Sequence, residues 1–258
     1  MSNKLSNISP KAKIGKGVKI ESFVNICEDV EIGDGSWIGP NVTIMDGARI
    51  GKNCKIFPGA VISAIPQDLK FEGEKSFAII GNNTTVREFA TINRATNYSG
   101  ITSVGDNCLI MAYVHIAHDC QIASNVILAN SAQLGGHVEI DEHAIIGGIS
   151  AIHQFVKIGS HTMVSGGSLV RKDIPPYIKV AKEPLCYIGV NSVGLSRKGF
   201  NAEKILEIQN IYRNIIQSNM NYTQALESIK KNFNSNKEIN NIIQFISKSE
   251  RGIIKGYK

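Results

Sequence analysis

All six histidines of the 258-residue chain lie between positions 115 and 161. Imidazole titrates near neutral pH, so histidine is the side chain that most often acts as a general base. His118 is followed directly by Asp119, and a neighbouring carboxylate can fix the tautomer of an imidazole and stabilise its protonated form. In a straight strand adjacent side chains point to opposite faces, so the pair can cooperate only at a corner or across a subunit contact. The pair predicts a base-assisted transfer that needs no serine or cysteine nucleophile.

The segments that carry these histidines repeat every six residues. Isoleucine occupies ten consecutive positions of the six-residue repeat from 8 to 62, and the same phase returns at 80–92 and 104–170. Helices repeat near 3.6 residues and strands at 2, so a period of six predicts short strands with a corner in every hexad. Small or β-branched residues four positions after each marker, such as Val18 and Ala60, are expected to share the interior. The pattern predicts a mainly β protein, a hexapeptide-repeat parallel β-helix whose hand the period does not fix.

Three hexads make one triangular coil, and coils stack at ~4.8 Å, so residues 18 apart become vertical neighbours. Counting in steps of 18 predicts a column of His118, Gly136 and Gln154. Three further histidines, His115, His137 and His153, should flank this column. The backbone N–H of Gly136 could donate to an oxyanion. One outward histidine could be ordinary surface, but four within three coils favour a functional site. His143 and His161 are also 18 apart, and we expect them to stack as plain surface residues.

Two segments interrupt the repeat, at about 63–76 and 94–103. Insertions thrown out of a solenoid often carry function, which we expect at least of the first. Beyond position 170 the sequence Asp-Ile-Pro-Pro-Tyr at 173–177 should end regular coiling. Helical periodicity follows Asn201, a candidate N-cap, and two more helices are predicted at about 222–233 and 237–248. The predicted domains are the β-helix at 1–190 and a C-terminal helical domain at 191–258, whose apolar face should cap the last coil.

Composition limits the partners. The net charge is +6 and the isoelectric point about 9.0, which suits anionic partners. Aromatics are only 7% and no nucleic-acid-binding motif is present, so nucleic acid is not expected. The five cysteines form no CxxC pair, and Cys54, Cys108 and Cys120 hold small inward positions, which predicts buried thiols. No apolar run approaches the ~20 residues of a spanning helix. We expect a soluble, cytoplasmic protein with no membrane insertion, and no metal site.

Five motifs, taken with the hexads, carry a family resemblance over essentially the whole chain: Gln-Asp-Leu-Lys-Phe at 67–71, His-Ile-Ala-His-Asp-Cys at 115–120, Ile-His-Gln-Phe at 152–155, Asp-Ile-Pro-Pro-Tyr at 173–177, and Gly-Val-Asn at 189–191 with Gly-Leu-Ser-Arg-Lys-Gly-Phe at 194–200. The chain resembles the acyl-ACP:UDP-N-acetylglucosamine O-acyltransferases of lipid A biosynthesis, where ACP is acyl carrier protein. Hexads alone would indicate only the hexapeptide-transferase superfamily, whereas the first interruption and the C-terminal motif make the match specific.

The resemblance implies a homotrimer of left-handed β-helices with sites between subunits, a hand that is an exception to the right-handed crossover rule. It implies that His118 removes the proton from the glucosamine 3-hydroxyl as that oxygen attacks a β-hydroxyacyl thioester of ACP, the first step of lipid A biosynthesis. Asp119 matches the orienting partner and Gly136 the oxyanion donor. The phosphopantetheine thioester is then a co-substrate, and no other cofactor is expected.

Ten polar residues are expected to contact the substrates: Gln67, Asp68, Lys70, His115, His137, His153, Gln154, Asn191, Arg197 and Lys198. Gly166 matches the region that sets acyl-chain length in the family, where a glycine leaves room for a longer chain. Three positions depart from the family pattern: Asn93 and Pro184 replace histidines, and Val193 replaces a glutamate. These departures concern sugar and nucleotide recognition, and they leave open whether a 3-amino sugar analogue is used.

Three other interpretations fit parts of the sequence. A sister enzyme that N-acylates the 3-O-acylglucosamine shares the coils but carries an extra N-terminal domain, whereas coils here begin by Ile8. A γ-carbonic-anhydrase-type zinc site could use three histidines across a subunit cleft, although the His-Ile-Ala-His-Asp spacing is not a strong metal motif. A purely structural solenoid explains the hexads but gives no reason for the first interruption or for the histidine column.

Overall fold

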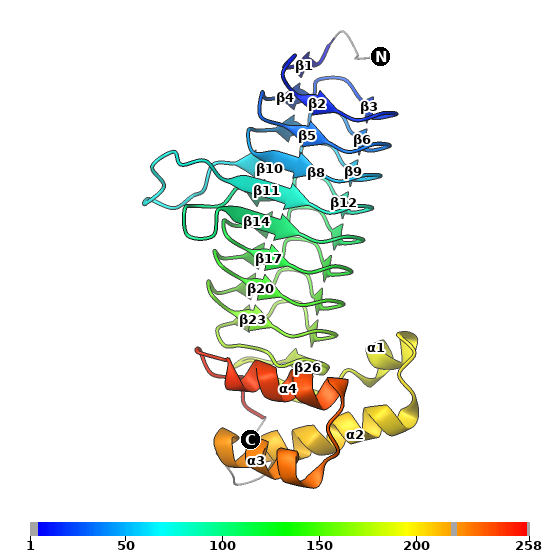
Figure 1. Ribbon diagram of the computed structural model, residues 1–258, viewed down its shortest axis with the longest axis vertical. Helices are drawn as coiled ribbons and strands as arrows, with labels where there is room; N and C mark the ends of the chain where they lie inside the picture. The colour runs from blue at the N-terminus through cyan, green and yellow to red at the C-terminus, as the bar shows by residue number, and fades with distance from the viewer. Residues whose placement is uncertain (1–4, 218–220, 257–258) are drawn as a thin grey trace.

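The computed structural model describes residues 5–217 and 221–256. In this part of the chain, short strands stack into three parallel sheets that form the three walls of a β-helix (Figure 1). Sheet A contains β1 (Asn7–Ile8), β4 (Asn25–Ile26), β7 (Thr43–Ile44), β10 (Val61–Ala64), β13 (Thr91–Asn93), β16 (His115–Ile116), β19 (Gln133–Leu134), β22 (Ala151–Ile152) and β25 (Leu169–Val170). Sheet B contains β2 (Lys13–Ile14), β5 (Glu31–Ile32), β8 (Ala48–Ile50), β11 (Phe77–Ile80), β14 (Ile101–Val104), β17 (Gln121–Ile122), β20 (Glu139–Ile140) and β23 (Lys157–Ile158).

Sheet C completes the third wall with β3 (Lys19–Ile20), β6 (Trp37–Ile38), β9 (Lys55–Ile56), β12 (Thr85–Val86), β15 (Leu109–Ile110), β18 (Ile127–Leu128), β21 (Ile145–Ile146), β24 (Met163–Val164), β26 (Ile178–Ala181) and β27 (Cys186–Val190). Its strands pair in parallel except the last pair, β26 and β27, which is antiparallel. Sheet C therefore continues beyond the Pro-Pro sequence, although the regular coils end there.

The predicted register is confirmed. Ile8 pairs with Ile26 and Ile116 with Leu134, in each case 18 positions along the chain. The hexad markers and the small residues four positions later lie inside, and they form one continuous buried cluster along the helix axis. Cys54, Cys108 and Cys120 are buried within it, as predicted, and burial raises the pKa of the Cys120 thiol to about 12.

Each coil has three corners, which we name by the sheets they join: the AB, BC and CA corners. The chain turns there through residues in the left-handed conformation, which asparagine, aspartate and glycine adopt at the lowest cost. At the BC corner Asn83, Asn107 and Asn125 all have φ between 55° and 62°. The corners thus explain why the sequence places Gly, Asn and Asp between its apolar markers.

Both interruptions of the repeat leave the helix at the AB corner. The first lies between β10 and β11 and projects as the long cyan loop of Figure 1; the second lies between β13 and β14. Because of these insertions Ile50 pairs with Ile80, and Ile80 pairs with Val104. Two consecutive coils therefore carry extra chain at the same corner.

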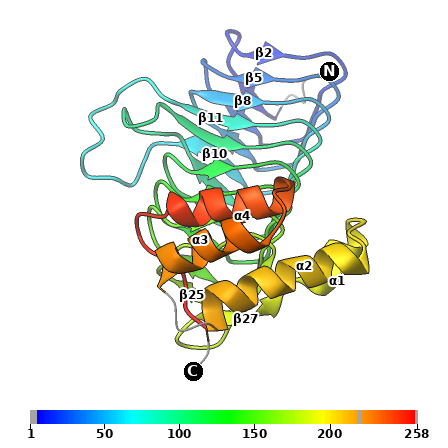
Figure 2. The same ribbon diagram turned by 60° about the horizontal axis from the view of Figure 1, so that its bottom comes forward.

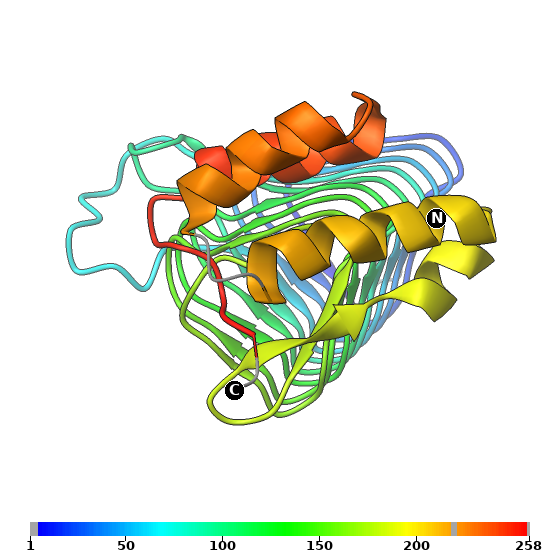
Figure 3. The same ribbon diagram turned by 90° about the horizontal axis from the view of Figure 1, so that it is seen from below.

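Helices follow the last strands: α1 (Ser192–Arg197), α2 (Ala202–Tyr212) continued by the π-helical turn η1 (Arg213–Gln217), α3 (Tyr222–Asn232) and α4 (Lys237–Ser247). Asn201 caps α2 and the last two helices lie where the sequence predicted them, whereas the short α1 was not predicted. Seen from its end, the β-helix is crossed by these helices (Figures 2 and 3). The buried Tyr212 hydroxyl donates to the Pro176 carbonyl at 2.6 Å, so the helices cap the last coil as predicted. In the described ranges, every helix is too short or too polar to cross a bilayer.

Candidate active site

His118 and Asp119 lie at the AB corner between β16 and β17. Asp119 has a φ of 61°, so the backbone turns sharply and the two neighbouring side chains meet instead of pointing to opposite faces. His118 Nδ1 lies 2.8 Å from Asp119 Oδ2. The requirement that the pair sit at a corner is met within one chain.

The Asp119 carboxylate is held as an anion. Burial alone would raise its pKa, but hydrogen bonds from Ser99, His118 and Thr96 hold that pKa below its usual value. An ionised carboxylate can only accept hydrogen bonds, so His118 Nδ1 carries a proton and donates a hydrogen bond to Asp119. The lone pair of His118 then lies on Nε2, where a base needs it.

Gly136 lies one coil below His118, against the face of the imidazole. A Cβ atom at Gly136 would lie 2.6 Å from His118 Cε1 and 2.7 Å from Nε2, closer than any real Cβ contact. The glycine is therefore needed for close approach of the ring.

The N–H of Gly136 has no hydrogen-bond partner among the described residues. At the same position of the BC corner, Lys52 N–H and Asn82 N–H point outward and donate to side-chain oxygens of the next coil, at 2.9 and 2.6 Å. The AB corner offers no such oxygen to Gly136. Its N–H is thus an unpaired donor beside His118, available to an incoming oxygen.

Asp68, from the first interruption, reaches the other side of the imidazole. Its Oδ2 lies 4.0 Å from His118 Nε2, too far for a hydrogen bond. The Lys70 N–H donates to Asp68 Oδ1 at 3.0 Å, which fixes the carboxylate within its turn. Gln67 and Lys70 are exposed on the same loop. The structure therefore places Asp68 beside His118 at the AB corner, while Gln67 and Lys70 lie at the surface.

A stack of rings continues below His118. The His137 ring lies edge-on to His118 at 5.1 Å between centroids, and it stacks flat on Phe155 at 4.2 Å. Tyr98, from the second interruption, meets His137 edge-on at 4.5 Å. Burial lowers the pKa of His137, so its ring is a neutral donor and acceptor at the edge of the site.

The remaining AB-corner predictions lie around this stack. His115 Nδ1 lies 2.7 Å from Thr91 Oγ1, and burial with the nearby His118 lowers the His115 pKa. His153 and Gln154 are exposed in the coil below Gly136, and His153 Nδ1 lies 3.3 Å from Arg251 Nη2. The predicted column of His118, Gly136 and Gln154 thus exists, with the three flanking histidines beside it.

The other predicted contacts lie elsewhere in the chain. Arg197 and Lys198 are exposed at the end of α1, which lies on the opposite side of the β-helix from the first interruption (Figures 1 and 3). Asn191 is buried; its Nδ2 donates to the His161 carbonyl at 2.9 Å and its Oδ1 caps α1. Gly166 lies at the CA corner. One chain therefore does not bring these four residues to His118.

His143 and His161 stack as predicted, with ring centroids 4.8 Å apart, but they are not plain surface residues. Tyr177 stacks on His161, and Phe200 covers it edge-on. Burial, with added repulsion from His143 and Lys198, lowers the pKa of His161 to about 4. The C-terminal helical region covers these histidines, which the coil spacing alone could not reveal.

Sequence reasoning missed Thr96, Ser99, Tyr98 and Phe155. The first two donate to Asp119, and the last two pack on His137. The available signal was the polar second interruption, Thr-Asn-Tyr-Ser at 96–99, one coil before the histidine motif.

The zinc-site interpretation can be tested against this geometry. Ligand atoms of His118, Asp119 and His137 lie within 4.8 Å of one another, close enough to hold a metal ion. However, the Asp119 carboxylate already accepts five hydrogen bonds from Thr96, Ser99 and His118. A metal would have to displace several of them, so the residues fit a hydrogen-bonded pair better than a metal centre.

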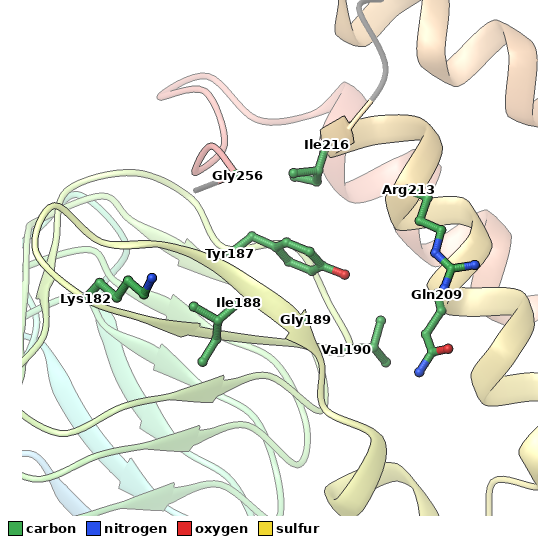
Figure 4. A pocket seen from close by; sticks show the side chains of 9 residues that line it. All are labelled: Lys182, Tyr187, Ile188, Gly189, Val190, Gln209, Arg213, Ile216 and Gly256. Atoms are coloured by element: carbon green, nitrogen blue, oxygen red, sulfur yellow. The ribbon is translucent and has the colours of Figure 1, made fainter. Parts of the chain in front are cut away.

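A separate cavity of about 760 Å³ opens between β27, α2 and η1 (Figure 4). Lys182 and Arg213 lie on its two sides, and among the described residues no acidic side chain lines it. None of the predicted site residues lies there. The charge of the cavity suits an anionic partner, but the cavity lies apart from His118 and the AB corner.

A model of the bacterial transferase hexapeptide (six repeats) matches residues 29–64 and 101–136, and a model of "Udp N-acetylglucosamine O-acyltransferase; Domain 2" matches residues 173–254. A Janthinobacterium sp. acyl-[acyl-carrier-protein]--UDP-N-acetylglucosamine O-acyltransferase is 41% identical over 253 residues, which cover 96% of this chain and 97% of that one. The Myxococcus xanthus protein of the same name is 40% identical, over 76% of both chains.

Solved structures agree. A UDP-N-acetylglucosamine acyltransferase from Bacteroides fragilis superposes with a TM-score of 0.97 at 48% identity, covering 99% of this chain and all of that one. The Francisella novicida UDP-N-acetylglucosamine acyltransferase gives 0.96 at 37% identity, over 99% and 94% of the two chains. The predicted fold class is confirmed: a left-handed parallel β-helix of hexapeptide repeats followed by a small C-terminal helical domain.

Proposed function

The chain belongs to the family of acyl-[acyl-carrier-protein]--UDP-N-acetylglucosamine O-acyltransferases, and on this premise we propose that it transfers a β-hydroxyacyl group from ACP to the 3-hydroxyl of UDP-N-acetylglucosamine, the first step of lipid A biosynthesis. Membership of the family makes it an acyltransferase. The observation that carries the proposed chemistry is the His118–Asp119 pair, 2.8 Å apart, lying over the bare Gly136.

The proposed reaction is a direct transfer. His118 Nε2 takes the proton of the sugar 3-hydroxyl as that oxygen attacks the thioester carbonyl carbon. The negative charge that forms on the carbonyl oxygen accepts a hydrogen bond from the Gly136 N–H. The carbon–sulfur bond then breaks, and the leaving thiolate takes the proton back from His118. Asp119 stabilises the imidazolium between the two steps, and no covalent enzyme intermediate forms.

The neighbouring groups suit a sugar. Asp68 lies 4.0 Å from His118 Nε2, and a hydroxyl placed between them could reach both. A carboxylate accepts hydrogen bonds from vicinal hydroxyls, while the neutral rings of His115 and His137 can donate or accept. Gln67 and Lys70 extend the same polar rim. We assign the sugar to the AB corner.

We further propose that the enzyme works as a homotrimer, with each site completed by a neighbouring subunit. In one chain α1, which ends at Arg197 and Lys198, lies on the opposite side of the β-helix from the first interruption, which carries Asp68. On this proposal a second copy supplies the pyrophosphate contact. Four large apolar side chains project from the CA corner: Phe23, Phe89, Tyr113 and Ile149, which are 53–77% exposed. Such a column suits burial against another copy. Gly166 lies farther along this corner, where we place the end of the acyl chain.

Acyl carrier protein is acidic, and the chain carries a net charge of +6. The cavity of Figure 4, with Lys182 and Arg213 on its walls, offers one basic surface for such a partner. Use of a carrier protein and a nucleotide sugar supports the expected cytoplasmic location. The carrier-protein surface and the location both stay predictions.

The experiment that tests the proposal measures acyl transfer by the native enzyme from a panel of β-hydroxyacyl-ACPs. UDP-N-acetylglucosamine and its 3-amino analogue serve as alternative acceptors, and mass spectrometry identifies the product. We expect an ester at the 3-oxygen. A product formed only from the 3-amino analogue would replace the proposed acceptor, with Asn93, Pro184 and Val193 as the first residues to examine. If neither acceptor is acylated, the substrate assignment fails and only a hexapeptide acyltransferase of unidentified substrate remains.

A further inference from the structure

The second interruption of the repeat lies directly above the His118–Asp119 pair. Its preceding strand, β13, pairs with β16, the strand that leads into His118. The chain then leaves the coil at Arg94 and returns at β14, and the residues between them lie one coil above the pair. Two of these residues, Thr96 and Ser99, direct both their backbone N–H and their hydroxyl groups at the Asp119 carboxylate.

The four contacts divide evenly between the two carboxylate oxygens. Thr96 N and Oγ1 lie 3.2 and 2.8 Å from Asp119 Oδ2, the oxygen that also accepts from His118. Ser99 N lies 3.1 Å from Oδ1, and the Ser99 hydroxyl is closer still. Donors on both oxygens fix the position of the carboxylate and also its rotation about the Cβ–Cγ bond. The oxygen that meets His118 Nδ1 is thereby held in one place.

These contacts also hold the charge of Asp119. Its side chain is fully buried, and a buried carboxylate without donors would become neutral or move to water. The hydrogen bonds overcome this effect and keep its pKa below the usual value. A neutral Asp119 could no longer stabilise a protonated His118.

Other bonds hold the interruption itself. The Asn97 N–H donates to Glu74 Oε1 at 2.9 Å, and the Gly100 N–H donates to the Thr96 carbonyl at 2.9 Å. Thr102 Oγ1 accepts from the Asp119 N–H at 2.8 Å. Ser99 lies at the surface, and its hydroxyl also lies 3.0 Å from the Ile101 carbonyl. Removing one hydroxyl should therefore leave the segment folded in place.

We propose that Thr96 and Ser99 are positioning residues, which act on the reaction through Asp119 and never touch the substrate. The interruption at 94–103 is on this view a built-in support for the base, distinct from the first interruption, which supplies Asp68 to the ligand side. The effect on activity rests on the proposed function, whereas the effect on the His118–Asp119 hydrogen bond does not.

The kinetic test compares Ser99→Ala and Thr96→Val with Asn97→Ala, a matched control in the same segment whose side chain is exposed. Loss of one hydrogen bond to a charged group should lower kcat about tenfold in each of the first two variants, with KM for the sugar nucleotide within about twofold. Ser99→Thr and Thr96→Ser keep a hydroxyl and should recover most of the rate, and Asn97→Ala should match the native enzyme. In an Asp119→Ala background, Ser99→Ala should cost nothing further.

The spectroscopic test needs no activity. In protein carrying ¹⁵N-labelled histidine, the His118 Nδ1–H should resonate far downfield because it is hydrogen-bonded to a carboxylate, with His118→Ala providing the assignment. In the Ser99→Ala and Thr96→Val variants, we expect this proton to exchange faster with water and its signal to move upfield. In Asn97→Ala, both the exchange rate and the signal should stay unchanged. The proposal would be overturned if the His118 signal were unchanged in both Ser99→Ala and Thr96→Val. It would also be overturned if Ser99→Ala lowered kcat by the same factor in the native and in the Asp119→Ala background. If the native enzyme fails to acylate the sugar, the spectra still decide whether the two residues hold Asp119.

Discussion

Histidines lie above one another at two corners of the β-helix, and the two corners differ in what surrounds the rings. At the AB corner, His118 has a carboxylate at 2.8 Å and a glycine beneath its face. At the BC corner, His143 and His161 lie against each other under Phe200. Burial, then the neighbouring His143 and Lys198, lower the pKa of His161. The first arrangement prepares an imidazole to accept a proton, and the second prevents it. In the proposed function, the same residue type at related positions of one repeat serves chemistry in one place and packing in the other.

Replacing one histidine at each corner tests this difference most strongly. His118→Ala should lower kcat by at least ~100-fold, the size expected for loss of a general base. His143→Phe keeps a ring in the stack and should leave kcat within about threefold. Both are measured with the same acyl-ACP and sugar nucleotide, after size-exclusion chromatography has established that the variants assemble like the native chain. Equal losses at the two corners would remove the distinction.

Gly136→Ala acts on the same corner without changing a titratable group. The added Cβ would lie 2.6 Å from His118 Cε1, so the imidazole must move away from Asp119 or from the substrate. A misplacement of this size should reduce kcat by roughly 10- to 100-fold. The urea midpoint should change little if the ring swings outward, and its measurement separates displacement of the base from unfolding. A variant with native kcat would mean that close contact between the ring and residue 136 is not needed.

The BC corner should appear in stability instead of rate. The pKa of His161 is lowered to about 4, from 6.5, so the unfolded chain binds more protons than the folded one between these pH values. The free energy of unfolding should therefore fall as the pH is lowered from 6.5 towards 4, by on the order of 2 kcal/mol for this group. Asp119 acts in another window: its depressed pKa contributes stability that is lost below its unfolded value, near 3.8.

Urea unfolding at pH 6.5 and pH 4.5 measures this effect in the native chain and in His161→Phe. The variant should lose distinctly less stability on acidification, because phenylalanine keeps the ring contacts with Tyr177 and Phe200 but binds no proton. An identical loss in both proteins would show that His161 does not titrate in this range.

The two corners also show how far the sequence could be read. The period of six predicts the coils, their register and the vertical alignment of His118 with Gly136, because in a solenoid a fixed step along the chain is a fixed step in space. It also predicts the stacking of His143 on His161. It could not predict what covers them, since Phe200 and Lys198 come from a domain outside the repeat.

At the AB corner, the contacts made by the two interruptions could not be predicted from the period either. Thr96 and Ser99 reach Asp119 because their segment leaves the coil, and within an irregular segment no period relates sequence distance to spatial distance. The motif at 67–71 was assigned through family resemblance for the same reason. Asn191, which the family resemblance assigned to ligand contact, caps α1 and donates to the His161 carbonyl, and its contact with a ligand stays a prediction.

The smallest expected effect concerns metal ions, and it separates a hydrogen-bonded AB corner from a zinc centre. His118, Asp119 and His137 have ligand atoms within 4.8 Å of one another, but the carboxylate is occupied by donors from Thr96, Ser99 and His118. We expect exhaustive dialysis against a chelator to leave kcat within about twofold, and elemental analysis of the active enzyme to find less than stoichiometric zinc. Activity lost on chelation and restored by zinc would assign His118 as a ligand. Asp119 would then orient a ligand in place of a base, and the acyl transfer would have to be derived again from a metal-bound species.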